Sequence, residues 1–435
     1  MRGNCQLVSD APRQRMMRCP RIMARILQTA FLLSLLLGGW PAVAQTAAPP
    51  KPLLDANHSV DWWFVFKLNA KTFPSCGGEE RSCIFGGKVQ DYTFGQQYVF
   101  ASSDNPVLTK GTGCAGDTPK DPIGATYSEV YEGSYNYVVW NDQFYGDPEI
   151  HGCGNACGAP WGHSKGLVAW NDAGEGLAMQ VTTPSWPASG SHAHERKSDG
   201  NTLGCVTDND VLVSQHFFSV RLSKQDLENV LDALANASVV TDVSNPQLVH
   251  NGGPQEIQSR VKLLGKKITS TTVLKFGLST GVGLLSKPSK LKVPPWQLVS
   301  AQLGGVPLRT ATWWANPKIN STTGSTSIAC WDPGLGQPGA VQIAITGNWE
   351  RTEFGLKGGS GPNFNHAKIG VSMADPVEFA IFGDMNQQGT LSADNCGSSQ
   401  NGRGGLFYII KDTKLAKSIA DLIKGESAPV EGQSK

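Results

Sequence analysis

The stretch VDWWFVFK, residues 60–67, is an almost unbroken run of aromatic and β-branched side chains. Such a run is typical of a strand that is covered on both faces. We therefore expect residues 60–67 to form a buried strand at the start of the fold. The segment before it, residues 45–56, contains QTAAPPKPL and predicts a linker rich in Pro and Ala.

Other short apolar segments, bounded by Gly, Pro, Asn and Asp, predict further strands. These segments are residues 135–140, 167–170, 177–182, 211–214, 341–345 and 379–382. Residues 71–130 and 314–338 contain few such segments, and we expect them to form surface insertions.

Apolar residues recur at helical spacing over residues 227–234, behind Ser223 and Asp226, which can form a capping box. Similar patterns predict helices at 415–423 and 296–303. Because strands and helices mix along the chain, the sequence predicts the α/β class, as a sandwich of layers. Residues 426–435 follow the last helix and predict a flexible tail.

The N-terminus has the order of an export signal. Three arginines precede an apolar run at residues 26–37, and a small-residue Ala-Val-Ala site follows at 42–44. We therefore expect residues 1–44 to be a signal peptide with an extended N-terminus, and the mature protein to be secreted or periplasmic. The alternative is a membrane anchor, but the apolar run is short for a span. Translation could also start at Met16, Met17 or Met23.

Removal of residues 1–44 changes the charge balance. The whole chain has 37 basic and 36 acidic residues, and 31 and 35 of these remain after residue 44, a net charge of −4. This composition excludes a globally basic protein that attracts nucleic acid over its whole surface. Any contact with nucleic acid must be local, or must strengthen when carboxylates and histidines take up protons at low pH.

Eight cysteines follow residue 44, at positions 76, 83, 114, 153, 157, 205, 330 and 396. An even number of cysteines in an exported protein predicts disulfides. Eight cysteines allow 105 pairings, so the sequence leaves the pairing open. A local closure between Cys76 and Cys83 is one plausible pair.

Two short motifs carry the chemistry: His163-Ser164-Lys165 and His366-Ala367-Lys368. In a strand, residues i and i+2 point to the same face, so each His and Lys would project together. Residues 366–373 alternate between polar or small and apolar side chains, which favours a strand for the second motif.

This pairing suits hydrolysis of a phosphodiester. Lysine supplies positive charge for the non-bridging oxygens, and one histidine can attack phosphorus to form a covalent intermediate. The other histidine can protonate the leaving oxygen and then activate water. The motif alone is a weak signal, because unrelated surface histidines and lysines also fall two residues apart.

The chain also resembles the deoxyribonuclease II family, as a bacterial-type member of this branch of the phospholipase D superfamily. The resemblance runs in order over about residues 57–410. The shared segments are VDWW (60–63) with KL (67–68), WNDQ (140–143), GHSKG (162–166), TTPSWP (182–187), NHAK (365–368), GDMNQ (383–387) and GRGG (402–405).

The resemblance implies a phospholipase D-like layered sandwich with two similar halves, each giving one His-x-Lys motif to a shared site. The motifs lie 203 residues apart, which suits a first half at 57–240 and a second half at 241–425. One chain could then form the site as a monomer with an internal pseudo-dimer, and a homodimer is the alternative.

The resemblance further implies metal-independent hydrolysis of DNA at acid pH, with 3′-phosphate ends and no cofactor. It assigns catalysis to four residues, which are His163, Lys165, His366 and Lys368. Asn386 is carried over as a donor to phosphate oxygens. In the first half, Thr182 and Ser185 stand at the corresponding positions and are expected to bind substrate. The sequence leaves open which histidine is the nucleophile.

Several other residues have two interpretations. His151, Cys153 and Cys157, with His192 and His194, could bind zinc, but their spacing is loose, and we expect disulfides and no metal. Six tryptophans could stack on bases or pack in the core. They are Trp62, Trp63, Trp186, Trp313, Trp314 and Trp331. Trp186 is the best candidate for stacking, because it follows the strand after the first motif. Arg403 could contact phosphate or only solvent.

The leading hypothesis is therefore a metal-independent acid endonuclease with DNA as its partner and no membrane association after signal removal. The alternatives are a related phosphodiesterase that acts on RNA or phospholipid, and a secreted binding protein without activity.

Overall fold

The computed structural model describes residues 47–432, apart from residues 77–81, 89–95, 198–199 and 207–209. The predicted signal at residues 1–44 and the alternative start sites lie outside the described residues. The described residues form one compact unit. Within the described residues, no helix is long and apolar enough to cross a membrane.

The first sheet has eight strands in the order β10-β6-β7-β8-β9-β3-β4-β5. These strands are β3 (Trp62–Lys67), β4 (Tyr98–Ser102), β5 (Thr109–Lys110), β6 (Asn136–Asn141), β7 (Lys165–Trp170), β8 (Gly176–Val181), β9 (Gln215–Leu222) and β10 (Val249–His250). The predicted opening strand is confirmed as β3, and all six of its residues are buried. It lies between β9 and β4, so both of its edges are paired.

The second sheet has seven strands in the order β11-β12-β19-β18-β17-β13-β14. These strands are β11 (Leu274–Gly277), β12 (Gly283–Lys287), β13 (Leu308–Ala311), β14 (Val341–Ile343), β17 (Ile369–Ser372), β18 (Phe379–Gly383) and β19 (Gly405–Lys411). Two hairpins complete the strands. They are β1 (Leu53–Asp55) with β2 (His58–Ser59), and β15 (Thr346–Trp349) with β16 (Thr352–Gly355).

The two sheets share the order of five strands. The first contains β6-β7-β8-β9-β3 and the second contains β13-β17-β18-β19-β12, and all neighbours in both runs are antiparallel. In chain order, each set also has one helix before its second strand and one after its last. These helices are α1 (Pro122–Tyr131), α2 (Lys224–Asn236), α4 (Pro295–Gln302) and α5 (Thr413–Leu422).

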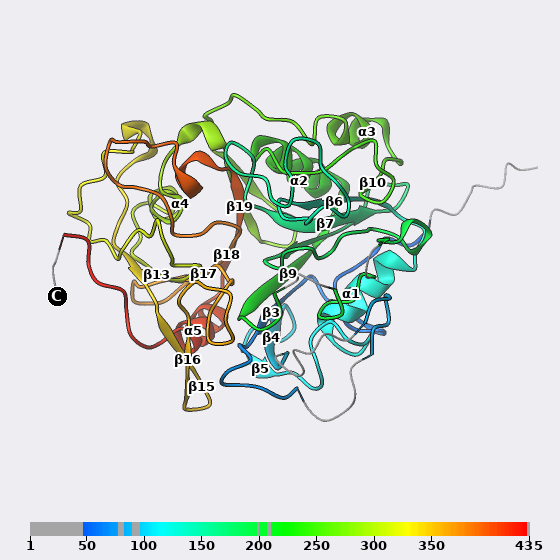
Figure 1. The fold of residues 1–435 in the computed structure, drawn as a ribbon, viewed down its shortest axis with the longest axis horizontal. Coiled ribbons are helices and arrows are strands. Elements are labelled where there is room, and N and C mark those ends of the chain that lie inside the picture. Colours follow the sequence, from blue (N-terminus) through cyan, green and yellow to red (C-terminus); the bar gives the residue numbers. More distant parts are fainter. Residues whose placement is uncertain (1–46, 77–81, 89–95, 198–199, 207–209, 433–435) are drawn as a thin grey trace, which may run out of the picture. The chain divides into compact units, whose positions relative to one another are not determined.

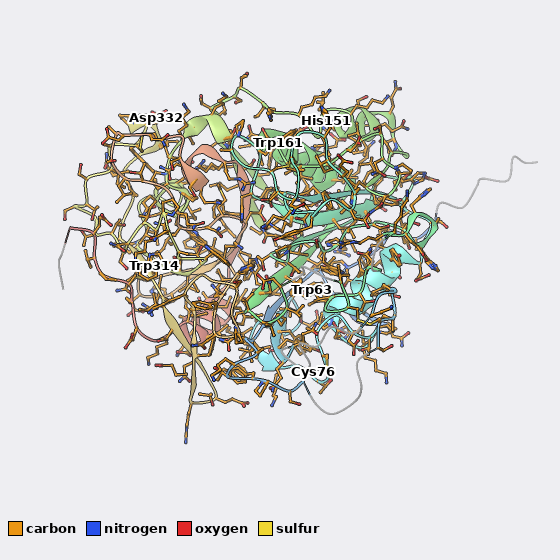
Figure 2. All side chains as sticks on the ribbon, viewed as in Figure 1. Trp63, Cys76, His151, Trp161, Trp314 and Asp332 are labelled. Carbon is orange, nitrogen blue, oxygen red and sulfur yellow. A yellow bond between two sulfur atoms is a disulfide. The ribbon has the colours of Figure 1, made fainter. Side chains whose placement is uncertain are left out.

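Aromatic rings join the two sheets. The ring of Phe64 in β3 stacks on that of Phe382 in β18, with centroids 4.3 Å apart. The ring of Phe218 in β9 packs on that of Tyr408 in β19, with centroids 5.1 Å apart. One continuous core therefore contains residues of both sheets. Figure 1 shows the blue-to-green elements of the first sheet on one side and the yellow-to-red elements of the second on the other. In Figure 2, Trp63 lies among packed side chains, whereas Cys76 and Asp332 lie nearer the periphery.

The predicted α/β class is confirmed, and the helix after Ser223 forms with its capping box, as α2. This helix contacts β8 and β9 of the first sheet and β11, β12 and β19 of the second, so it also joins the two sheets. The last predicted helix forms as α5, and the one at 296–303 forms as α4. A short helix, α3 (Gln255–Val261), packs on α2.

Four predictions about local structure are wrong. The linker at 45–56 already contains β1, because Leu53 is buried and donates its N–H to Thr126. Residues 211–214 precede β9 and form no strand of their own. The supposed insertion at 71–130 holds the buried elements β4 and α1.

The fourth correction concerns the tail at 426–435. Its described part, residues 426–432, is bound to the second sheet by backbone hydrogen bonds. Ala428 donates its N–H to Ile343 at 2.8 Å, and Ile345 donates to the carbonyl of Glu426 at 2.9 Å. Ala428 is buried as a result.

The described cysteines form four disulfides: Cys76–Cys114, Cys83–Cys205, Cys153–Cys157 and Cys330–Cys396. The predicted Cys76–Cys83 pair is therefore wrong, because each of these cysteines joins a more distant part of the chain. Disulfides in this number are typical of proteins that fold in an oxidising compartment.

The Cys83–Cys205 disulfide closes 122 residues, whereas Cys153–Cys157 closes only 4. Loss of the long closure, by Cys83→Ser with Cys205→Ser, is expected to lower the free energy of unfolding by about 5 kcal/mol. Loss of the short one, by Cys153→Ser with Cys157→Ser, is expected to cost about 2 kcal/mol. Urea unfolding of the two double variants measures both values, and a larger loss for the short closure would contradict this expectation.

Candidate active site

Both His-x-Lys motifs lie where a strand begins. Lys165 is the first residue of β7, and Lys368 directly precedes β17. The predicted strand at 366–373 is therefore too long at its start, since only Ile369–Ser372 is paired in the sheet. The two motifs occupy the same position in the shared strand order, ahead of β7-β8-β9 and β17-β18-β19.

Each motif is held by the other part of the chain. The backbone N–H of His163 donates to the carbonyl of Gly404 at 2.8 Å, and the N–H of His366 donates to the carbonyl of Ser214 at 2.7 Å. Gly404 and Ser214 directly precede β19 and β9, the equivalent strands of the two sheets. This crossed anchoring places both motifs at the junction of the two sheets.

The ring of His163 has a defined tautomer. Its Nδ1 lies 2.7 Å from the backbone carbonyl oxygen of Asp384. A carbonyl oxygen only accepts hydrogen bonds, so Nδ1 carries the proton, and Nε2 of the neutral ring keeps its lone pair. Burial lowers the pKa of His163 well below its ordinary value, and Lys165, Arg403 and Lys368 lower it further against the opposing charge of Asp142. His163 therefore stays neutral into the acid range.

Lys165 lies in a buried ion network. Its Nζ is 2.6 Å from Oδ1 of Asp142, and the Arg403 guanidinium donates to Oδ2 of the same carboxylate at 2.8 Å. Arg403 also donates to the carbonyls of Trp161 and Gly162, just before the first motif. Burial alone would raise the pKa of Asp142, but Lys165, His163 and Arg403 outweigh this effect and hold it below its usual range. The network thus stays ionised at acid pH.

His366 faces a carboxylate and an indole. Its Nε2 lies 3.0 Å from Oδ2 of Asp210, at ion-pair distance but without the direction of a hydrogen bond. The ring packs edge-on against Trp313, with centroids 4.2 Å apart. Burial lowers the pKa of His366 well below its ordinary value, and the charges of Lys368, Lys165 and His163 lower it further. The charges of the first motif lower the pKa of His366, which shows that the fold brings the two motifs close together.

Lys368 has no carboxylate in ion-pair contact among the described residues; its Nζ donates to the carbonyl of His366. Its own backbone N–H donates to Nδ1 of the buried His216 at 3.1 Å. Burial, with help from Lys165, lowers the pKa of Lys368 to about 7. Lys368 is therefore charged in the acid range and, unlike Lys165 and Arg403, its charge is not neutralised by contact with Asp142.

Asp384 connects the two sheets under the site. Its side chain accepts from Gln180 of β8 and from the backbone N–H of Leu406 in β19, both at 2.9 Å. Burial raises the pKa of Asp384 to about 7, although hydrogen bonds from Ser164, Leu406 and Gln180 oppose this shift. Asp384 thus combines a side chain that joins β8 to β19 with the carbonyl that orients His163.

Asn386 lies near this region and is buried. Its Nδ2 donates to Gln388 at 2.9 Å, and its Oδ1 has no partner among the described residues. An amide Nδ2 carries two N–H groups, so one of them is left to donate to a phosphate oxygen.

The three substrate-binding candidates of the first half lie inside the protein. Thr182 accepts the backbone N–H of His216 at 3.0 Å, and Ser185 is completely buried. The Trp186 side chain is 1 % exposed, and its indole donates to the carbonyl of Asn201. The Thr182 and Ser185 side chains are about as buried as those of Lys165 and Lys368, so their contact with substrate stays a prediction, whereas the Trp186 ring packs in the core.

Three of the residues considered as zinc ligands have other partners. Cys153 and Cys157 are joined in a disulfide, and His192 instead contacts Glu132 and Glu195. Among the described residues, no group of three or more His, Cys, Asp or Glu side chains could hold a metal ion.

Three acidic residues of the site were not predicted. Asp142 lies in the WNDQ segment and Asp384 in GDMNQ, but their charges alone give no sign of a partner. Asp210 lies in a loop without any motif. Arg403, whose role was open, contacts Asp142 rather than only solvent.

Buried paired histidines and lysines at the junction of two equivalent sheets define the chain as a candidate phosphoryl-transfer hydrolase. A comparison with protein-family models gives the match that this class predicts: the model for deoxyribonuclease II matches residues 51–427. The chain belongs to the deoxyribonuclease II family and is a phosphodiester hydrolase that acts on DNA. This membership overturns the alternative of a binding protein without activity. A search among curated proteins gave no match.

Proposed function

We propose that the protein is a metal-independent acid endonuclease that cuts DNA through a phosphohistidine intermediate and leaves 3′-phosphate ends. The observation that carries the proposal is the tautomer of His163. With Nδ1–H bonded to the Asp384 carbonyl, the neutral ring has a lone pair on Nε2 for attack. We assign His163 as the nucleophile and His366 as the general acid and base.

In the first step, Nε2 of His163 attacks phosphorus, and the bond from phosphorus to the 5′ oxygen breaks. His366 donates a proton to that oxygen, and the strand leaves with a 5′ hydroxyl. In the second step, His366 takes a proton from water, and the resulting hydroxide attacks phosphorus. The phosphorus–nitrogen bond breaks, which gives a 3′ phosphate and restores both histidines.

The cations of the site have different tasks in this mechanism. Lys368, without an ion-pair partner among the described side chains, binds the non-bridging oxygens, and the second N–H of Asn386 assists. Lys165 is held in place by Asp142 and supplies a fixed positive charge on the side of the first motif.

The acid range follows from the same groups. A pKa of His366 well below its ordinary value means that this ring carries the proton it must donate only at acid pH. The pKa of Lys368 is lowered to about 7, so its charge is present below this pH and lost above it. The pKa of His163 is lowered in the same direction, so it is the bond from Nδ1–H to the Asp384 carbonyl that assigns the neutral, nucleophilic role to His163 in this mechanism.

We further infer that the five strands shared by the two sheets mark two similar halves, near the boundary expected at 240–241. This duplicated order supports an internal pseudo-dimer of the phospholipase D type, in which one chain completes the site as a monomer. The four disulfides support export to a secreted or periplasmic location.

The proposal is tested on a DNA oligonucleotide with a fluorescent 5′ label. After a short reaction at acid pH and an alkaline quench in detergent, part of the label should migrate with the protein, as the covalent phosphohistidine adduct. The shortened product that carries the 5′ label should become a substrate for 3′ end-labelling only after phosphatase treatment. A free 3′ hydroxyl on this 5′-labelled product, or cleavage of RNA or phospholipid but not DNA, would overturn the proposal.

Asp210 provides a prediction on pH dependence. Its ionised carboxylate, 3.0 Å from Nε2 of His366, repels a phosphodiester from the site. Burial raises its pKa to about 6, against the charges of Lys67 and Lys368, so it is neutral below this pH and ionised above it. Asp210→Asn is therefore expected to raise kcat/KM at pH 7 about tenfold and to change it little at pH 4.5.

The matched control is Asp104→Asn, which removes the carboxylate of an exposed pair, with Asp104 2.8 Å from His58. Its pH profile should equal that of the unmodified protein. If Asp210→Asn instead lowers kcat/KM at pH 4.5, Asp210 assists His366 and does not compete with substrate.

A further inference from the structure

Two buried lysines outside the His-x-Lys motifs occupy equivalent positions in the two sheets. Lys67 is the last residue of β3, and Lys287 is the last residue of β12. Lys67 pairs with Gln215, the first residue of β9, and Lys287 pairs with Gly405, the first residue of β19. Both lysine side chains are completely buried.

The two ammonium groups bind the same kind of acceptor, at equivalent places. Lys67 Nζ donates to the backbone carbonyls of Val211, at 2.6 Å, and Leu68. Lys287 Nζ donates to the carbonyls of Asn401, at 2.9 Å, and of Pro288, the residue that follows it. Each lysine thus contacts the residue after itself and a residue shortly before β9 or β19, the strand with which it pairs.

These contacts lie next to the atoms that anchor the histidines. Val211 is three residues before Ser214, whose carbonyl accepts the N–H of His366, and Asn401 is three residues before Gly404, whose carbonyl accepts the N–H of His163. Lysine in a pocket of carbonyls can satisfy several acceptors at once, because its ammonium has three donors.

The same segments also carry the charged partners of the site. Lys287 donates to the carbonyl of Arg403 at 2.7 Å, and the Arg403 side chain reaches Asp142. Lys67 holds Val211, whose neighbour Asp210 faces His366. Each lysine therefore contacts the segment that anchors the motif of the opposite sheet. Lys67 contacts the segment that anchors His366, and Lys287 contacts the segment that anchors His163 and reaches the partner of Lys165.

We propose that Lys67 and Lys287 are a pair of positioning residues, each of which fixes the backbone segment that anchors the histidine of the opposite half. The cost of keeping Lys287 charged supports a functional role. Burial lowers the pKa of Lys287 to about 7, so the folded state disfavours its ammonium, and yet it is protonated in the acid range. This proposal rests on the proposed function for the roles of the histidines, but the anchoring itself can be tested separately.

The test uses Lys67→Met and Lys287→Met, which keep the apolar stem and remove the ammonium. In the full-length mature protein, each is expected to lower kcat for DNA cleavage at acid pH about 10- to 100-fold with little change in KM, because small displacements of reacting groups have effects of this size. Exposed lysines give matched controls in the same halves: Lys71→Met and Lys290→Met should leave kcat unchanged.

Ring resonances of the histidines, measured by NMR and assigned with the His163→Ala and His366→Ala variants, separate positioning from general support of the fold. Lys287→Met should shift the resonances of His163 and leave those of His366, and Lys67→Met should do the reverse. Equal shifts of both rings in either variant, or no shift of either ring, would overturn the proposal.

Lys67→Gln and Lys287→Gln cover the case in which a Met variant does not fold. Each keeps N–H donors for the carbonyls, so it should recover part of kcat and restore the resonance of the opposite histidine. If Gln variants fold but show neither recovery nor a selective shift, the proposal is equally wrong. If the unmodified protein cuts no DNA, the proposed function fails, while the spectra still decide the anchoring.

Discussion

His163→Ala and His366→Ala are each expected to lower DNA cleavage at acid pH by at least about 10³-fold. His163→Ala removes the nucleophile that the Asp384 carbonyl orients. Among the described residues, no other histidine ring is hydrogen-bonded to that carbonyl and could replace it. His366→Ala removes the group that protonates the 5′ oxygen and later activates water. Rates of plasmid nicking measure both losses.

An activated substrate distinguishes the two roles. A p-nitrophenyl ester of thymidine 3′-phosphate has a leaving group that needs no proton, so its first step does not depend on a general acid. His366→Ala should therefore release about one equivalent of p-nitrophenol per protein in a burst, and His163→Ala should release none. The exposed His192→Ala is the control and should behave as the unmodified protein. A burst from His163→Ala would reverse the assignment.

Asp142→Asn is expected to lower the free energy of unfolding by about 3–5 kcal/mol at pH 7. The substitution keeps the shape of the side chain but leaves Lys165 and Arg403 buried without the carboxylate that neutralises them. We also expect a loss of DNA cleavage at acid pH, because Lys165 is no longer fixed. Urea unfolding at several pH values measures the stability difference.

The pH dependence of this difference has a definite sign. The pKa of Asp142 is lower in the folded protein than in the unfolded chain, so its stabilisation is complete above the unfolded pKa of about 4. It is lost as the pH falls from there towards the folded pKa. The difference between the two proteins should thus be equal at pH 7 and pH 5 and smaller at pH 3.

Asp61→Asn is the matched control, because Asp61 forms an exposed ion pair with Arg221. Its cost should stay below about 1 kcal/mol. A similarly small cost for Asp142→Asn at pH 7 would show that the buried network contributes little.

Local patterns predicted the elements that carry their own signal. The apolar run of β3 and the capping box of α2 are properties of neighbouring residues, and both elements form as expected. The interior strand β9 was missed because it contains Gln215, His216 and Ser219, which look exposed in sequence. They are buried because tertiary contacts satisfy them: His216, for example, lies 3.3 Å from Gln180 of β8.

The site divides in the same way. Both His-x-Lys motifs are visible in the sequence, whereas the carboxylates that contact them are brought there only by the pairing of strands. Asp142 reaches Lys165 because β6 and β7 pair Asn141 with Lys165, and Arg403 comes from a segment 261 residues away from Asp142. The burial of Trp186 likewise depends on rings of other elements, such as Tyr127 and Phe217, and no local pattern reports it.

The central claim is hydrolysis of DNA by paired histidines at acid pH without a metal ion. The most direct measurement is plasmid cleavage by the mature protein from pH 4 to pH 8 in excess EDTA, beside His163→Ala and His366→Ala. We predict cleavage that is strongest in the acid range, survives EDTA and is lost in both variants. Cleavage that EDTA abolishes, or that persists in either histidine variant, would contradict the account.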